Sequence, residues 1–247
     1  MLNPYESGKL LSEYLFFHYA SPAGFAGGMP VPEGALDFPA RVVRELLDPA
    51  RPAGRALDVG CAVGRSSFEL ARTFEYVIGV DFSAAFIAAA QSMKAAGEAT
   101  CSVVEEGRRM RKVVVSAPGG VHRERVDFEV GDAMALRADL GAFDLVLAAN
   151  LICRLPDPRR FLARLPDLVL PGGQLLLATP FSWLEEYTAE DKWLGGRPDG
   201  PASLEVLSAL LEPHFELQEK RELPFLIREH SRKFQYVVSL GTRWVRS

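Results

Sequence analysis

Apolar residues along this chain follow two periods, and their alternation predicts the fold. Short, almost continuously apolar runs are typical of buried strands, and apolar residues that recur every three or four positions are typical of helices. The strand-like runs are residues 55–60, 76–81, 126–133, 143–150 and 172–180. The helix-like stretches are residues 64–73, 83–96, 156–169 and 203–213. Because strands separated by helices form βαβ units, we predict an α/β fold with a mostly parallel sheet and helices on both faces.

Segments outside this alternation predict additions to the sheet. Helical spacing covers residues 5–19 and 35–48, on either side of a Gly- and Pro-rich loop at residues 20–34. Two β-rich runs within residues 101–120 predict an inserted hairpin, whose basic cluster is interpreted as a solvated tip. The C-terminal third predicts two antiparallel strands at the sheet edge, at 214–223 and 232–245 with Pro224 between them.

Composition narrows the class of protein. The chain has 247 residues, of which 48% are hydrophobic and 24% charged, so it can bury a core without disulfides or a structural metal. A net charge of −4 argues against a nucleic-acid or anionic-membrane partner. The three cysteines lack zinc-ligand spacing, and the N-terminal residues lack the pattern of a signal peptide. We therefore expect a cytoplasmic enzyme without a metal.

The strongest chemical signal is the run ALDVGCAVGRS at residues 56–66. It predicts a strand that ends near Asp58, a turn containing Gly60 and Gly64, and a helix. The glycines would let the backbone approach a ligand closely. Asp81 ends the next predicted strand, where an acidic side chain can bind the hydroxyls of a ribose.

The details of this turn favour S-adenosylmethionine among the nucleotide cofactors. A dinucleotide needs a middle glycine for its pyrophosphate, and Ala62 stands there; a P-loop would need a Gly-Lys pair before Ser or Thr. Asp58 suits a cationic amino-acid tail, and the alternative is a generic turn with a chance aspartate. Polar residues also end the later strands, with Asp132 expected at the adenine and Asn150 at the transfer site. The predicted cofactor residues are Asp58, Gly60, Cys61, Ala62, Gly64, Asp81, Phe82, Asp132, Ala133, Asn150 and Leu151.

Residues 40–240 as a set resemble class I S-adenosylmethionine-dependent methyltransferases, including the run PGGQLLLATP. A narrower resemblance, to the 4-mercaptohistidine N1-methyltransferases of ovothiol biosynthesis, rests on YESGKLLSEYLFFHY, DVGCAVGRSSFEL, NLICRLPDPRRFLARLPDLVLPGG, TPFSWLEEYTAEDKWLGG and IREHSRKFQY. In that family, too, the turn departs from the general glycine pattern at the position of Ala62. The resemblance implies a Rossmann-like seven-stranded sheet and methyl transfer to an imidazole nitrogen of 4-mercaptohistidine (5-thiohistidine), with S-adenosylhomocysteine as the other product. It also implies functional coupling to a separate sulfoxide synthase, because this module is often fused behind one.

With this chemistry, the chain divides into three parts of a single domain, 1–247. Residues 1–50 would form a helical cap. Residues 51–180 would form the cofactor-binding core, which includes the inserted hairpin at about 101–120. Residues 181–247 would form an acceptor lid and a C-terminal hairpin.

Candidate acceptor residues come from the first helix and from the segment after the fifth strand. His18 is the candidate general base, with a packed core histidine as an equal alternative. Aromatic residues of segment 181–193 could clamp a flat ring, or simply pack. Arg154 could bind the substrate carboxylate, with Arg228 and Lys233 as alternatives, and Glu185 or Glu186 could bind the ammonium. The catalytic candidates are His18, Asn150 and Tyr187, and the substrate candidates are Tyr14, His18, Tyr19, Arg154, Trp183, Glu186, Tyr187, Trp193 and Arg228.

Two other functions stay open at this point. The acceptor could be another small amine or a quinone, or the chain could bind S-adenosylmethionine without catalysis. The predicted aromatic lid favours an enzyme, because a bare binding module would not need one.

Overall fold

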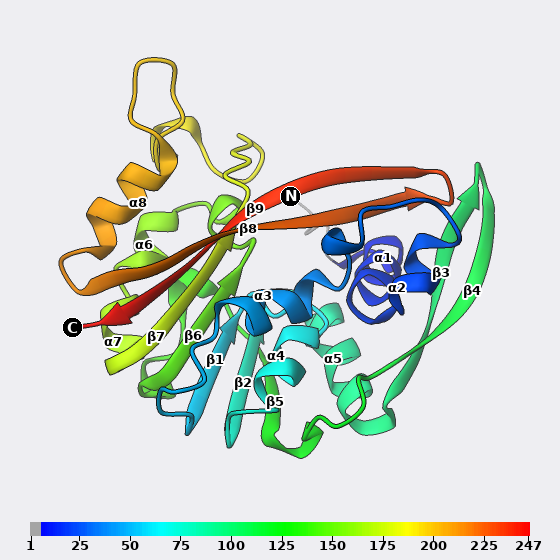
Figure 1. Cartoon of the computed structure of the whole chain (residues 1–247), viewed down its shortest axis with the longest axis horizontal. Helices are drawn as coiled ribbons and strands as arrows, with labels where there is room; N and C mark the ends of the chain where they lie inside the picture. The colour runs from blue at the N-terminus through cyan, green and yellow to red at the C-terminus, as the bar shows by residue number, and fades with distance from the viewer. Residues whose placement is uncertain (1–5) are drawn as a thin grey trace.

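A seven-stranded sheet forms the centre of the computed structural model, which describes residues 6–247 (Figure 1). Its strand order is β5-β2-β1-β6-β7-β9-β8, and only β9 runs antiparallel to its neighbours. The strands are β1 (Arg55–Val59), β2 (Tyr76–Asp81), β5 (Val126–Val130), β6 (Phe143–Ala149), β7 (Val169–Thr179), β8 (Phe215–His230) and β9 (Lys233–Arg246). The predicted Rossmann-like sheet with an antiparallel C-terminal edge is confirmed.

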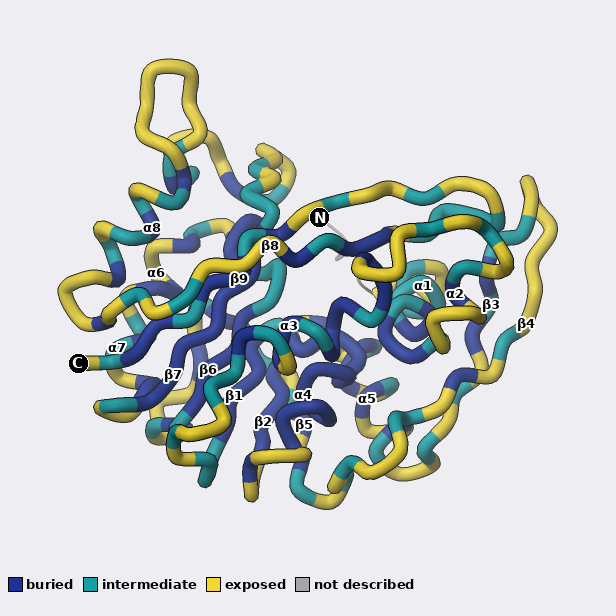
Figure 2. Tube along the Cα trace, in the orientation of Figure 1, coloured by how far each residue is buried: buried dark blue, intermediate teal, exposed yellow. Residues whose placement is uncertain are grey.

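Helices cover both faces of this sheet, and successive strand residues point to opposite sides. Leu145 and Leu147 of β6 belong to one buried cluster, and Val146 belongs to the other. The first cluster packs under α3 (Phe38–Leu46), α4 (Arg65–Leu70) and α5 (Ala84–Ala96), and the second under α6 (Pro158–Leu162), α7 (Leu165–Leu168) and α8 (Ser203–Leu211). Figure 2 shows the central strands buried along most of their length.

The predicted helix at 156–169 is wrong as a single element, because the structure divides it into α6 and α7. Pro166 lies in the first turn of α7. A proline has no N–H to donate and its ring collides with the carbonyl four residues back, so it starts a helix well but cannot continue one.

A cap lies beside the carboxyl ends of the strands. It consists of α1 (Gly8–Tyr19), α2 (Pro22–Ala26) and a separate two-stranded sheet of β3 (Glu98–Glu106) and β4 (Arg109–Ser116). The region predicted as a loop at 20–34 therefore contains a short helix, begun by Ser21 as N-cap and by Pro22. Short 3-10 turns occur at Glu33–Ala35, Arg123–Arg125, Ala133–Ala135, Ala138–Leu140, Ile152–Arg154 and Glu190–Lys192.

The two C-terminal strands extend beyond the central sheet and reach the cap (Figure 1). Pro224 was predicted between the strands, but it lies inside β8, opposite Val238 of β9. Because β8 is the edge strand, the missing N–H of the proline can face away from the ladder. The carbonyl of Pro224 accepts a hydrogen bond from Arg41 of α3 at 2.9 Å.

Arg228, an alternative candidate for the substrate carboxylate, is engaged by the inserted hairpin instead. Its guanidinium donates to the Val104 carbonyl at 3.0 Å and to Glu105 at 3.1 Å, and it lies over the Phe16 ring. With a side chain only 6% exposed, Arg228 joins β8, β3 and α1 into one unit.

None of the helices within residues 6–247 has the length and apolar character needed to cross a bilayer.

We expect Gly64→Ala to destabilise the fold strongly. Gly64 has a φ of +87°, and a Cβ there would lie 2.5 Å from Cζ of Phe128. Backbone strain and overpacking together should lower the free energy of unfolding by about 2–5 kcal/mol. Gly28→Ala is the matched control, because Gly28 has a φ of +80° but open space around it. It should cost only the strain, about 1–2 kcal/mol. Urea unfolding that gives equal losses for both variants would contradict the packing argument.

Candidate active site

The turn between β1 and α4 is fastened to the end of β2. The backbone N–H groups of Gly60 and Cys61 both donate to the Val80 carbonyl, at 2.8 and 3.0 Å. The turn contains three residues with positive φ, Gly60, Ala62 and Gly64. A Cβ on Gly60 would approach Leu151 to 3.0 Å, and one on Gly64 would meet Phe128. The glycines are therefore required by backbone conformation and by packing within the chain, which is a different reason from the predicted approach to a ligand.

Asp81 completes this attachment from the end of β2. Its Oδ2 accepts from the Ala62 N–H and its Oδ1 from the Ser83 N–H, both at 2.9 Å. Burial raises the pKa of Asp81, and these N–H groups oppose the shift. A carboxylate has about four acceptor positions, so both oxygens can accept further hydrogen bonds. The next residue, Phe82, is 64% exposed, which leaves an aromatic face open at the edge of the site.

The sequence predicted that Asp58 would bind a cationic tail, but its carboxyl group is engaged by α4. Its side chain is buried, and Oδ2 accepts from the hydroxyls of Ser66 and Ser67, at 2.7 and 2.6 Å. Burial raises the pKa of Asp58 to about 6, although the two serine hydrogen bonds lower it. The carboxyl group therefore joins β1 to α4 and stabilises the turn between them.

The ends of β5 and β6 place two more predicted residues. Asp132 caps the 3-10 turn at Ala133–Ala135 by accepting from the Met134 N–H at 2.8 Å. Asn150 has a φ of +53°, and its Oδ1 accepts from the Ser239 hydroxyl of β9 at 2.6 Å. Ser239 escaped the sequence analysis because its partner lies 89 residues away.

Helix α1 reaches this edge of the sheet through Tyr14 and Tyr19. Tyr19 donates from its hydroxyl to the Val63 carbonyl in the β1–α4 turn at 2.6 Å, so it holds the turn and not the acceptor. Tyr14 packs on Phe86 of α5, with ring centroids 4.7 Å apart. Burial and the charge of Asp81 raise the pKa of Tyr14 to about 12, while Arg154 opposes the shift. Tyr14 thus lies within electrostatic reach of residues from both predicted halves of the site.

His18 is unsuited to the predicted role of general base. The ring is 7% exposed, and burial, followed by the charge of Arg65, lowers its pKa to about 3. A general base works best with a pKa near the operating pH. His18 is therefore neutral at pH 7 and a weak proton acceptor.

The chain is similar in sequence and in structure to known proteins. Residues 57–177 match the family model Methyltransf_11, described as a methyltransferase domain. Over this stretch the chain is therefore similar to a methyltransferase domain. Trans-aconitate 2-methyltransferase of Deinococcus radiodurans is 31% identical over 148 residues, which cover 59% of this chain and 45% of that protein. Norajmaline N-methyltransferase of Rauvolfia serpentina is 24% identical over 171 residues, covering 68% of this chain and 51% of that protein. The chain spans about half the length of the curated relatives it matches.

Solved structures agree with the methyltransferase fold. The N-methyltransferase NodS from Bradyrhizobium japonicum WM9, in complex with S-adenosylhomocysteine, superposes with a TM-score of 0.54 at 14% identity. The match covers 96% of this chain and 98% of NodS. A structure described under the conversion of a disulfide bond into a thioacetal group in echinomycin biosynthesis gives a TM-score of 0.54 at 19% identity, covering 97% and 93% of the two chains.

Arg154 holds the segment that was predicted to form a lid. Its Nη1 donates to the Ser182 carbonyl at 3.0 Å, and its guanidinium lies 4.8 Å from the centre of the Tyr187 ring. Within residues 6–247, no carboxylate lies within ion-pair distance of Arg154. An arginine without an acidic partner beside an aromatic ring can bind a carboxylate ligand.

The two tryptophans of this segment hydrogen-bond within the protein, which agrees with packing, one of the two roles that the sequence left open for them. The indole N–H of Trp183 donates to the Ser203 hydroxyl of α8 at 2.9 Å, and that of Trp193 donates to the Thr188 carbonyl at 2.8 Å. Glu186 is exposed. Of the predicted lid aromatics, Tyr187 is therefore the one that the geometry associates with Arg154.

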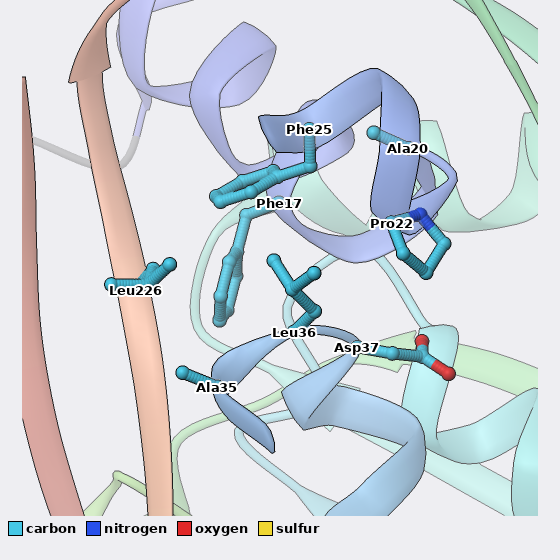
Figure 3. Close-up of a pocket in the computed structure, with 8 residues that line it drawn as sticks. All are labelled: Phe17, Ala20, Pro22, Phe25, Ala35, Leu36, Asp37 and Leu226. Atoms are coloured by element: carbon cyan, nitrogen blue, oxygen red, sulfur yellow. The ribbon is translucent and has the colours of Figure 1, made fainter. Parts of the chain in front are cut away.

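Figure 3 shows a pocket that is lined by the cap helices α1 and α2, the segment just before α3 and strand β8. It is lined by Phe17, Ala20, Pro22, Phe25, Ala35, Leu36, Asp37 and Leu226, none of which was predicted to bind donor or acceptor. Across the described part of the chain, no group of three or more His, Cys, Asp or Glu residues is placed to hold a metal ion.

The buried Asp58 predicts a pH dependence of stability. Its pKa is about 6 in the folded chain and near 4 in an unfolded one, so the folded state binds the proton more tightly. The resulting stability is present below the unfolded pKa and is lost as pH rises through 6. Asp58→Asn keeps an oxygen for the two serines and removes this titration. Relative to that variant, the free energy of unfolding of the wild type should fall by up to about 3 kcal/mol between pH 4 and pH 7. Parallel pH profiles in urea unfolding would disprove the assignment.

Proposed function

We propose that this chain transfers a methyl group from S-adenosylmethionine to an imidazole nitrogen of 4-mercaptohistidine, giving ovothiol. The observation that carries the methyl transfer to a small acceptor is the position of Tyr14. Electrostatic interactions relate it to Asp81 at the donor turn and to Arg154 and Tyr187 at the lid. These interactions support a single transfer site between the donor turn and the predicted lid. The choice of a thiol-histidine is supported by the sequence resemblance.

The residues on the donor side support the binding of a nucleoside. Asp81 can accept from two ribose hydroxyls while it holds the Ala62 and Ser83 N–H groups. The exposed ring of Phe82 offers a flat surface for adenine, and Asp132 lies at the end of the neighbouring strand. S-adenosylmethionine would supply an electrophilic methyl group on its sulfonium at this site.

The acceptor side is built for alignment and not for proton transfer. Arg154 presents its guanidinium without an acidic partner among the described residues, so it suits the carboxylate of an amino-acid acceptor. Tyr14 keeps its phenol proton at pH 7 and can donate a hydrogen bond. A thiol-histidine that enters as a thiolate with an unprotonated ring nitrogen needs no base from the protein, because that nitrogen already has its lone pair. Orientation then supplies most of the rate enhancement.

This reaction needs an enzyme that installs sulfur on the histidine ring. A sulfoxide synthase acting on histidine belongs to the reaction class that would supply this substrate, and the resemblance supports such a coupling.

Methylation of a carboxylate oxygen is the second candidate. Trans-aconitate, in the name of one relative, is a polycarboxylate, and Arg154 would suit such an acceptor as well. Other relatives are named as N- and as O-methyltransferases.

An acceptor assay separates these functions. The purified chain is incubated with S-adenosylmethionine and 4-mercaptohistidine, histidine or trans-aconitate, and products are identified by mass spectrometry. We expect methylation on a ring nitrogen of 4-mercaptohistidine, with histidine slower by about tenfold or more because a site shaped for the sulfur loses a contact without it. Methyl ester formation on trans-aconitate alone would favour the second candidate.

Arg154→Gln should raise KM for 4-mercaptohistidine by about 10- to 100-fold, because a charged hydrogen bond contributes about 1.5–3 kcal/mol. Affinity for S-adenosylhomocysteine, measured by calorimetry, should stay within about twofold. The control acceptor is 4-mercaptoimidazole, which lacks the carboxylate and should be methylated equally by wild type and variant. Equal losses with both acceptors would mean that Arg154 only holds Ser182 and the lid.

A further inference from the structure

A buried serine of β9 fixes the side chain of Asn150 at the end of β6. The Ser239 hydroxyl donates to Oδ1 of Asn150 at 2.6 Å, and Ser239 is 0% exposed. Asn150 has a φ of +53°, and its backbone N–H donates to the Ala178 carbonyl of β7 at 2.7 Å. Asparagine tolerates this left-handed conformation better than most residues, because its short polar side chain can hydrogen-bond locally. The orientation of its amide group is therefore set from a different strand.

The nitrogen of the same amide group is left for a bound molecule. The amide carries its oxygen and its NH2 group on opposite sides, so a hydroxyl that donates to the oxygen has the NH2 group turned away from it. Within residues 6–247, Nδ2 of Asn150 has no hydrogen-bond partner, and it is not among the side-chain atoms that are buried without one. Asn150 thus offers an accessible hydrogen-bond donor, while its acceptor is already used.

Asn150 stands between the donor turn and the predicted lid. A Cβ on Gly60 would approach Leu151, the next residue, to 3.0 Å. Arg154, four positions after Asn150, holds the Ser182 carbonyl. Ligands of such sheets bind at the carboxyl ends of the strands, which is where Asn150 lies. An acceptor whose carboxylate is bound by Arg154 would therefore extend its ring past Asn150 toward the methyl donor.

A hydrogen-bond donor beside the acceptor ring selects the groups that the ring carries. The nitrogen that is methylated uses its lone pair to form the new bond, so an N–H donor on that lone pair would block the reaction. A ring thiolate is a second electron-rich group, and hydrogen bonds to a charged acceptor are stronger than those to a neutral one. The free NH2 group of Asn150 suits this sulfur.

We propose that Ser239 is a positioning residue, which turns the Asn150 amide group so that Nδ2 donates a hydrogen bond to the thiolate sulfur of the acceptor. This contact distinguishes 4-mercaptohistidine from histidine. The inference rests on the proposed function for the identity of the acceptor.

Three variants test the contact. Ser239→Ala removes the hydroxyl, so the amide group can also turn its oxygen toward the acceptor. Asn150→Asp keeps an oxygen for Ser239 and tolerates the positive φ, but it has no N–H. Thr242→Val is the matched control, because Thr242 is another buried hydroxyl of β9 and bonds to the Trp244 indole. For each variant, kcat and KM are measured with 4-mercaptohistidine and with histidine, and Tm is measured without ligands.

We expect Ser239→Ala to raise KM for 4-mercaptohistidine by about tenfold and to change kcat by less than about twofold, because the contact forms on binding and is not strengthened during transfer. The ratio of kcat/KM for 4-mercaptohistidine to kcat/KM for histidine should fall by about tenfold as well. Asn150→Asp should raise KM for 4-mercaptohistidine by about 100-fold, since its carboxylate repels the thiolate, while Tm stays close to that of the wild type. Thr242→Val should lower Tm and leave the ratio unchanged.

Other results would overturn the inference. An unchanged ratio in Ser239→Ala, with Tm lowered as in Thr242→Val, would give Ser239 a structural role. A loss in kcat with KM unchanged would place the amide group at the reacting nitrogen and not at the sulfur. A wild-type chain that methylates trans-aconitate and neither 4-mercaptohistidine nor histidine would overturn the proposed function, whereas a wild type active on 4-mercaptohistidine beside an unaffected Ser239→Ala would overturn the inference alone.

Discussion

The candidate site depends on the attachment of the β1–α4 turn to the end of β2. The Val80 carbonyl accepts from Gly60 and Cys61, and the Asp81 carboxylate accepts from Ala62 and Ser83. Parallel strands bring their carboxyl ends to the same edge of the sheet. The carbonyl and side-chain acceptors at the end of β2 therefore lie close to the turn that follows β1. The turn is thereby held in a conformation with three positive φ values, one of them on an alanine.

A second set of interactions fixes the cap on this turn. Tyr19 reaches the Val63 carbonyl from α1, and a buried ionic network joins α3 to α4. In that network Glu69 accepts from Arg44 and Arg65, both at 2.7 Å. Burial alone would raise the pKa of Glu69, but these hydrogen bonds lower it. Breaking one partner of such a network leaves a buried charge uncompensated, so the network holds Arg65 and the start of α4 in place.

The inserted hairpin supports the cap from the other side. Cys101, Val103 and Val115 join the cluster that contains Leu15 and Phe16 of α1. Arg228 then bonds the hairpin to β8. Contacts from the hairpin and from β8 thus keep the Tyr14 and His18 face of α1 over the sheet edge.

The sequence by itself determined the elements whose cause is local. β2 begins and ends as predicted at residues 76–81, because a continuous apolar run between polar residues admits a buried strand. Ser83 caps α5 as expected, since its hydroxyl needs only the N–H of Phe86 three residues on. The glycine-containing turn after β1 and the position of Asp81 at the end of β2 were predicted for the same reason, because strand ends and glycines are visible in the sequence.

Tertiary structure alone decided what the polar side chains bind. Asp58 accepts hydrogen bonds from Ser66 and Ser67, which lie only eight and nine residues further along the chain. Even so, the direction of its carboxyl group depends on how α4 packs on β1. Arg228 reaches Val104 across 124 residues of sequence, and the Trp183 indole reaches Ser203. The sequence favoured neither a general base nor a packed core residue for His18. In the structure, burial and the charge of Arg65 lower its pKa, and Nδ1 has no hydrogen-bond partner among the described residues. Desolvation and long-range hydrogen bonds arise only when distant segments meet, so no local pattern can encode them.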